Sequence, residues 1–269
     1  GLCMKDIQLT VPATYQPLTI ATGIRCSARR TPDKTMFIEG EKRRTFAEFC
    51  QRIDRLQAHA LGELGLQFGQ HAAVVGPNCI EFLEVVVGLS EVGIASATLS
   101  HRLNSVELAD ICDDARAEVL FAHETCRATI AAAHFATIKQ VIYFGDDYEQ
   151  RLANAPALAE APRLAGEWDT FCIPYTSGTT GRPKGVMLSH RARALVFPVF
   201  AIEYGCMGPD DRFLAIAPLA HGAGMAFALC PVFFGGTCEI MPKFDPEAVV
   251  SKLGSGEFTG VFLVPTQFH

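Results

Sequence analysis

The sequence lacks any long run of basic residues. Its 23 Lys and Arg residues are outnumbered by 29 Asp and Glu residues, which gives a net charge of −6. The densest group of cations is the short Lys42-Arg43-Arg44. Because nucleic acid binding needs a concentrated positive surface to neutralise phosphates, this composition argues against a nucleic-acid-binding protein.

Long hydrophobic runs are also missing. No uninterrupted apolar stretch is long enough to cross a bilayer, so no transmembrane segment is expected. The first ten residues include Lys5 and Asp6 and hold no apolar segment of a signal peptide. With 49% hydrophobic and 19% charged residues among 269, the composition is that of a packed globular protein, and we expect it to be cytoplasmic.

No CxxC pair occurs among the ten cysteines, and no other metal-ligand spacing is present. Most of the cysteines lie inside apolar runs, where a free thiol behaves as a small hydrophobic residue. We therefore expect reduced cysteines and no metal site formed by side chains. The ten positions are Cys3, Cys26, Cys50, Cys79, Cys112, Cys126, Cys172, Cys206, Cys230 and Cys238.

The first half of the chain alternates helical and strand patterns. A capping box at 45–48 precedes an apolar stripe at helical spacing that Gly65 ends. The alternation predicts an α/β protein with parallel sheets covered by helices on both faces. Strands are expected at 72–76, 94–99, 118–122 and 140–144, and helices at 46–64, 82–92, 106–116 and 125–135.

The helix over 82–92 is expected to turn one apolar side inward, through Phe82, Val85, Val86 and Leu89. Residues 146–169 are acidic and rich in Ala and Pro, which predicts a surface connection between subdomains.

A loop rich in hydroxyls and glycines follows this connection. The apolar segment Phe171 to Tyr175 predicts a strand entering the loop, residues 186–188 predict a strand leaving it, and Ser189 is a suitable N-cap for the next helix. Glycines let successive backbone N–H groups point inward, hydroxyls add donors, and Lys184 adds a mobile positive charge suited to phosphates. By composition alone, an ordinary surface loop is the alternative.

The loop is not a Walker A sequence. Counted from Gly178, the lysine falls one position late, and a strand rather than a helix follows it. A P-loop kinase or GTPase is therefore disfavoured.

The run Tyr175-Thr-Ser-Gly-Thr-Thr-Gly-Arg-Pro-Lys-Gly-Val-Met-Leu-Ser-His190 resembles the signature loop of the adenylate-forming superfamily, which includes acyl- and aryl-CoA synthetases. Departures from the usual pattern are minor, namely Gln70 for an acidic residue and Ser100-His101 for Asn-Pro. Further stretches resemble landmarks of the same family: Thr31-Pro-Asp-Lys34, Arg44-Thr-Phe-Ala-Glu-Phe49, Val75-Gly-Pro-Asn78, Arg102-Leu103 with Glu107-Leu108, Pro218-Leu-Ala-His-Gly-Ala-Gly224, Phe244-Asp-Pro-Glu247 and Leu263-Val-Pro-Thr266.

The resemblance implies a function and a set of site residues. The loop would hold the phosphates of ATP while a carboxylate attacks the α-phosphate, and an acyl-adenylate would then react with coenzyme A. His221 would position the acid and is the candidate catalytic residue, and Arg182 and Pro183 would shape the loop. Residues assigned to the ATP phosphates are Thr176, Ser177, Gly178, Thr179, Thr180, Gly181 and Lys184.

The resemblance also implies domain organisation and partners. The chain would be an incomplete N-terminal large domain that binds ATP and the acid, with subdomains at roughly 45–195 and at 1–44 plus 205–269. The small C-terminal domain, which carries a catalytic lysine, would be absent, so the fragment alone is expected to be inactive. ATP, Mg²⁺ and coenzyme A are the expected cofactors and co-substrates, and a homodimer is compatible with the family.

Several alternatives remain open for the acid and its acceptor. A fatty acid is the preferred substrate, and an aryl or other small acid is the second choice. An enzyme that loads a carrier protein and a non-catalytic nucleotide- or acyl-binding module are further alternatives. The lack of an Asp near His221 argues against an amino acid substrate.

Overall fold

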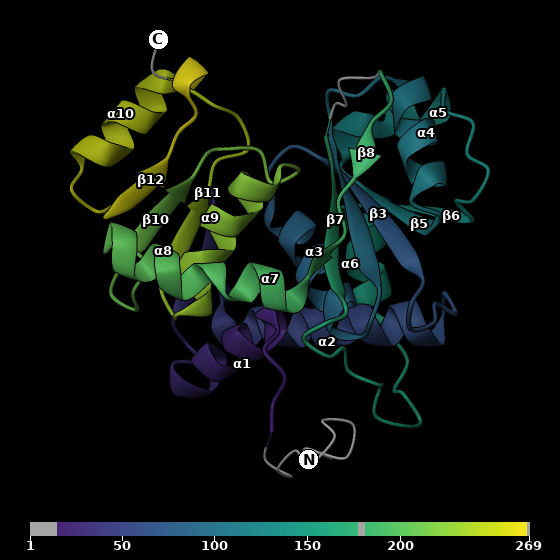
Figure 1. Ribbon diagram of the computed structural model, residues 1–269, viewed down its shortest axis with the longest axis horizontal. Helices are drawn as coiled ribbons and strands as arrows, with labels where there is room; N and C mark the ends of the chain where they lie inside the picture. The colour runs from purple at the N-terminus through teal and green to yellow at the C-terminus, as the bar shows by residue number, and fades with distance from the viewer. Residues whose placement is uncertain (1–14, 177–180, 268–269) are drawn as a thin grey trace, which may run out of the picture.

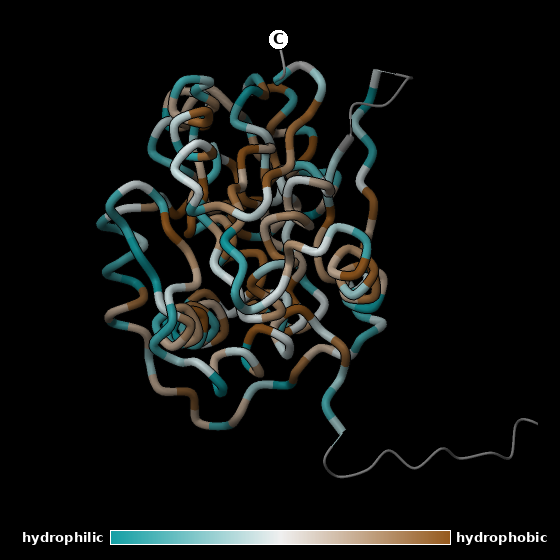
Figure 2. The backbone as a smooth tube through the Cα atoms, turned by 90° about the vertical axis from the view of Figure 1, so that its left-hand side faces the viewer, coloured by the Kyte–Doolittle hydropathy of each residue, from teal (hydrophilic) through white to brown (hydrophobic). Residues whose placement is uncertain are grey.

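Two β-sheets stand side by side in the chain, with helices between and around them (Figure 1). The computed structural model describes residues 15–176 and 181–267, excluding the side chains of Thr176 and Thr266. In Figure 2 the hydrophobic stretches gather in the interior and hydrophilic stretches lie around the periphery. No helix in the described ranges is long and apolar enough to cross a membrane.

The first sheet has the strand order β12-β10-β11-β1-β2. Strands β12, β10, β11 and β1 run parallel, and β2 returns antiparallel along β1. Phe37 near the start of the chain is thus the register partner of Cys238 near its end. The strand bounds are β1 Thr35–Glu39, β2 Lys42–Thr45, β10 Arg212–Ala215, β11 Thr237–Ile240 and β12 Gly260–Phe262.

The second sheet has the order β6-β5-β3-β4-β7-β8, and β9 also pairs with β7. The strands from β6 to β7 are parallel, whereas β8 and β9 run antiparallel to β7. The strand bounds are β3 His71–Gly76, β4 Ala95–Ser100, β5 Ala117–Ala122, β6 Gln140–Tyr143, β7 Thr170–Thr176, β8 Lys184–Gly185 and β9 Leu188–Ser189.

Helices cover both faces of the two sheets, as the alternating pattern predicts. Helices α4 and α5 pack on the outer face of the second sheet, α10 packs on the outer face of the first, and α3 lies between the sheets. The bounds are α1 Ile20–Arg30, α2 Phe46–Gly62, α3 Ile80–Glu91, α4 Ser105–Asp114, η2 Glu124–Cys126, α5 Arg127–Ala131, α6 Asp146–Ala153, α7 His190–Ala194, α8 Val196–Tyr204, α9 Gly222–Phe233, α10 Pro246–Gly254 and η3 Pro265–Gln267.

Helix α2 forms as the sequence predicts. The Thr45 hydroxyl accepts a hydrogen bond from the Glu48 amide at 3.1 Å, which satisfies one free N–H at the helix start. The apolar stripe from Phe46 to Ala60 is buried, because residues three or four apart share one face of the helix.

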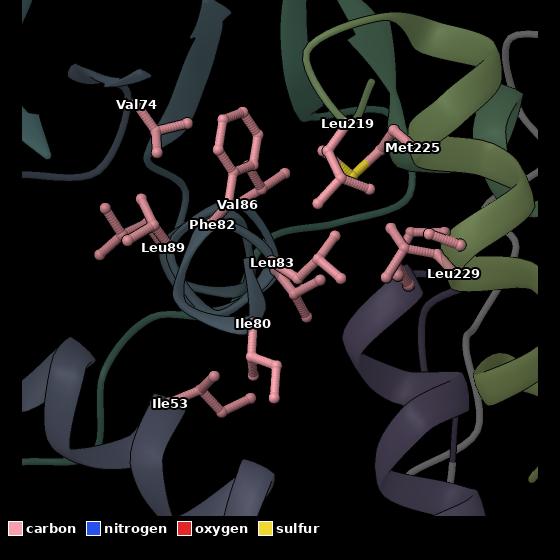
Figure 3. Packing of buried hydrophobic residues seen from close by; sticks show 14 of the residues in the cluster. Ile53, Val74, Ile80, Phe82, Leu83, Val86, Leu89, Leu219, Met225 and Leu229 are labelled. Carbon is pink, nitrogen blue, oxygen red and sulfur yellow. The ribbon is translucent and has the colours of Figure 1, made fainter. Parts of the chain in front are cut away.

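Helix α3 differs from the prediction of a one-sided amphipathic helix. All twelve of its residues are buried, and Figure 3 shows its side chains pointing in all directions around the helix axis. Its three glutamates are buried with cationic partners: Lys42 for Glu81, Arg52 for Glu84 and Arg25 for Glu91. Because each buried carboxylate has a cation, the helix can lie between two sheets despite its charges.

The helix predicted over 125–135 is shorter than expected. It consists of η2 and α5 and ends at Ala131. Beyond it, the Asp113 carboxylate accepts hydrogen bonds from the amides of Ala136 and Thr137 at 2.9 and 3.2 Å. These amides bond to a side chain instead of to helix carbonyls, so the chain leaves the helical path.

The predicted surface connection over 146–169 is wrong in its first third, where α6 forms. Tyr148 and Leu152 lie one turn apart and are buried against the core. Asp146, Asp147 and Glu149 occupy the first turn, where negative charge favours a helix N-terminus. The acidic composition that suggested a loop is therefore also a helix-start signal.

Candidate functional site

The hydroxyl-rich loop connects β7 and β8 as a hairpin. Thr176 at the end of β7 is the register partner of Lys184 at the start of β8. The predicted phosphate contacts Ser177, Gly178, Thr179 and Thr180 lie outside the described residues. Gly181 has φ +82°, a conformation that favours glycine, and both Gly181 and Lys184 are exposed at the hairpin.

The base of this hairpin is fixed by Tyr175. Its ring lies over Gly185, where an added Cβ would come within 2.8 Å of the ring. The Tyr175 hydroxyl donates to the Asp114 carboxylate at 2.6 Å, and burial together with this bond raises the pKa of the phenol. The glycine after Lys184 is therefore needed for the strand to pass close to the aromatic ring.

His221 lies in a tight turn between β10 and α9. Its amide donates to the Pro218 carbonyl at 3.1 Å, and its own carbonyl accepts from the Met225 amide at 3.0 Å. Gly224 packs so closely that an added Cβ would be 2.1 Å from the Pro218 oxygen. The His221 side chain makes no capping bond and is exposed, so it is free to meet a ligand.

A cavity of about 340 Å³ joins the hairpin to this turn. It lies at the carboxyl ends of the parallel strands β4 and β7, the edge where α/β sheets place their ligands. Gly181, Arg182 and His221, which are far apart in the sequence, line the same space. The other lining residues are Thr98, Leu99, Ser100, Leu103, Glu107, Asp110, Ile111, Tyr175, Pro183 and Ala220.

The charges around the cavity are mixed. Arg182 contributes a cation, whereas Glu107 and Asp110 on α4 contribute carboxylates. The Glu107 carboxylate accepts from the Asn104 amide at 3.0 Å and so completes a capping box. Glu107 is thereby held at the helix start, and the cationic hairpin faces it across the space.

The end of the signature motif is structural. Ser189 caps α7 as predicted, because its hydroxyl accepts from the Ala192 amide at 3.0 Å. His190 is fully buried, bonds to the Ser90 carbonyl at 3.2 Å and packs against Phe171. Burial lowers the pKa of its imidazole to about 4.

The sequence reasoning missed several residues of this cavity. Thr98 and Ser100 lie at the end of β4, and Leu103 and Ile111 form an apolar wall. In the sequence, only their location near strand ends could have identified them, since side chains at the carboxyl ends of neighbouring parallel strands meet at one edge of the sheet. The departure Ser100-His101 thus places a hydroxyl residue in the cavity wall.

Cysteines and other potential metal ligands are dispersed over the described residues. No group of His, Cys, Asp or Glu in the described ranges is arranged to hold a metal ion. The nine cysteines of the described chain are free, and burial raises the pKa of the Cys172 thiol to about 12. Buried thiols such as that of Cys172 are protonated and act as core residues.

The AMP-binding enzyme family matches residues 24–269. The chain is 32% identical over 248 residues to a feruloyl-CoA synthase from Amycolatopsis, covering 90% of this chain and 48% of that protein. It therefore spans about half the length of the curated relative.

Solved structures share the fold. A fatty acyl-CoA synthetase from Mycobacterium tuberculosis matches with a TM-score of 0.81 at 25% identity, covering 93% of this chain and 50% of that one. ATP-bound MatB from Rhodopseudomonas palustris matches with a TM-score of 0.79 at 26% identity, covering 94% and 50%. The α/β architecture and the resemblance to the adenylate-forming superfamily are thus confirmed, and the chain belongs to the AMP-binding enzyme family.

Proposed function

We propose that this chain is the ATP- and acid-binding part of an enzyme that converts a carboxylic acid to an acyl-adenylate and then to a coenzyme A thioester. The observation that supports it is the cavity at the carboxyl ends of β4 and β7, which brings the glycine-rich hairpin and His221 to one space. ATP-bound MatB shares this fold. The chain spans about half of its relative, so the complete activity is proposed for a protein that contains the chain.

The reaction needs little covalent chemistry from the protein. A carboxylate oxygen forms a bond to the α-phosphorus, the bond from that phosphorus to the bridging oxygen breaks, and pyrophosphate leaves. The coenzyme A thiolate then attacks the acyl carbon. The bond from that carbon to the oxygen on phosphorus breaks, and AMP leaves with this oxygen. Positioning of reactants and stabilisation of phosphate charge supply most of the rate in such a transfer.

The residues of the chain divide this work between two segments. The hairpin, with Thr176 to Gly181 and Lys184, holds the phosphates through backbone N–H groups, hydroxyls and one cation. His221 holds the carboxylate beside the α-phosphate. Mg²⁺ is proposed as a counter-ion of the nucleotide, since this hard cation prefers oxygen ligands and would offset phosphate charge.

The proposed acid has no α-amine, and two classes are candidates. A fatty acid is the first, and the name of the M. tuberculosis structure, a fatty acyl-CoA synthetase, supports it. An aromatic acid is the second, because the 32% identical relative is a feruloyl-CoA synthase. A panel of both acids, with pyrophosphate exchange as the readout in the protein that contains the chain, separates the two classes.

The nucleotide site is tested on the chain itself by titration calorimetry with ATP and Mg²⁺. Lys184→Ala is expected to weaken ATP binding about tenfold, since it removes a charge-assisted hydrogen bond. Lys139→Ala is the matched control, because Lys139 precedes β6 and so lies at the opposite edge of the sheet. If the unaltered chain does not bind ATP, or if both variants bind it equally well, the proposed function is wrong.

A further inference from the structure

A single buried carboxamide links the two sheets near the candidate site. Asn78 lies in the turn between β3 and α3 and is 6% exposed. Its Nδ2 donates to the carbonyl oxygens of Ala217 at 3.0 Å and of Ile216 and Met241 at 3.3 Å. Its Oδ1 accepts from the Leu219 amide at 2.8 Å.

These partners lie just beyond the ends of two strands of the first sheet. Ile216 to Leu219 follow β10, and Met241 follows β11. From the same side, the Thr98 hydroxyl on β4 donates to the Ala220 carbonyl at 2.9 Å. Asn78, just after β3, and Thr98, on β4, thus both bond to the turn that carries His221.

We propose that Asn78 is a positioning residue, which sets the turn over 216–221 and so the place of His221 relative to the β7–β8 hairpin. The inference rests on the proposed function for the role of His221 in acid binding. The contact set itself does not depend on that function. The proposal gives a physical role to Asn78, the last residue of the family landmark Val75-Gly-Pro-Asn78.

The chemistry of the site explains why the residue is asparagine. A carboxamide donates and accepts at the same time, and its two N–H groups here serve three carbonyl oxygens, so one hydrogen is shared. An isosteric carboxylate would face those three oxygens without a donor, and their repulsion would displace it and so weaken its bond to the Leu219 amide as well. The turn has little room to relax, because Gly224 lies against the Pro218 carbonyl.

The test uses Asn78→Asp, with Asn104→Asp as a matched control. Asn104 caps α4 through its side-chain oxygen alone, accepting from Glu107, so aspartate serves there equally well. Amide hydrogen exchange at Leu219 is measured relative to amides of β3, and the His221 imidazole is followed by nitrogen NMR. ATP affinity is measured by calorimetry on the same samples.

For Asn78→Asp we expect Leu219 protection to fall about tenfold more than that of β3 and the His221 signals to shift. Unchanged Leu219 and His221 signals would overturn the inference, as would an equal loss of protection in all amides.

The positioning role of Asn78 can still be tested if the variant does not fold or if the unaltered chain does not bind ATP. If Asn78→Asp does not fold, Thr98→Val removes the second bond to the turn without changing shape, and a shift of the His221 signals is again required. If the unaltered chain binds no ATP, the proposed function fails, while the amide and imidazole data still decide the positioning role of Asn78.

Discussion

The buried imidazole of His190 couples the stability of the chain to pH. It is fully buried, its Nε2 bonds to the Ser90 carbonyl, and the desolvation of its charged form lowers its pKa from 6.5 to about 4. The carboxylates of Asp169 and Glu91 oppose this shift only in part. The folded protein therefore keeps this histidine neutral at a pH where the unfolded chain protonates it.

The sign and size follow from proton linkage. Above pH 6.5 neither state binds the proton and the stabilisation is fully present, whereas between pH 6.5 and 4 the unfolded state is favoured progressively. The full interval corresponds to about 3 kcal/mol at about 1.4 kcal/mol per pH unit. Between pH 7.5 and 5, we expect about 2 kcal/mol of the free energy of unfolding to be lost through His190.

The assay is urea unfolding of the chain at several pH values, followed by circular dichroism, for the unaltered protein and His190→Gln. Glutamine can still donate to Ser90 but does not titrate, so the difference between the two pH curves isolates this one group. His134→Gln, at an exposed position, is the control and should keep the pH profile of the unaltered chain. Parallel curves for the unaltered protein and His190→Gln would refute the reasoning.

Further substitutions test the interior and the His221 turn. Arg52→Ala strands the buried Glu84 carboxylate and should cost about 3–5 kcal/mol in urea unfolding, whereas Lys139→Ala, which removes an exposed ion pair with Glu118, should leave the midpoint nearly unchanged. Gly224→Ala places a methyl group against the Pro218 oxygen and should lower thermal stability. Its control is Gly254→Ala in α10, where an added Cβ meets no atom within 4 Å and a gain of about 0.5–1 kcal/mol is expected.

Local sequence patterns predicted most elements of the second sheet and failed where the partners are remote. The stripe of α2 is periodic, and its cap is local, so both could be found. The surroundings of α3 could not, since Glu81, Glu84 and Glu91 look like surface residues until their cations appear 39, 32 and 66 residues away. Burial of these carboxylates depends on tertiary pairing, which no window of sequence contains.

In the candidate site, too, local motifs could be predicted and contacts between remote segments could not. The hairpin motif and His221 could each be identified from a short segment, but their meeting at one cavity depends on the order of strands β4 and β7. Asn78 could be identified only as part of a family landmark, and its contacts could not be predicted, because a Gly-Pro-Asn turn has an ordinary local explanation. Its hydrogen bonds reach residues that lie 138 to 163 positions further along the chain.

The pairing of β1 with β11 has a consequence for synthesis of the chain. Phe37 and Cys238 are register partners although two hundred residues separate them. At about 5–20 residues per second on the ribosome, the N-terminal strand would wait about 10–40 s for its neighbour. The parallel strands of the second sheet all lie between these two segments, so that sheet can assemble during this interval. Until β11 has been synthesised, the edge of β1 that pairs with it stays open to pairing with other strands.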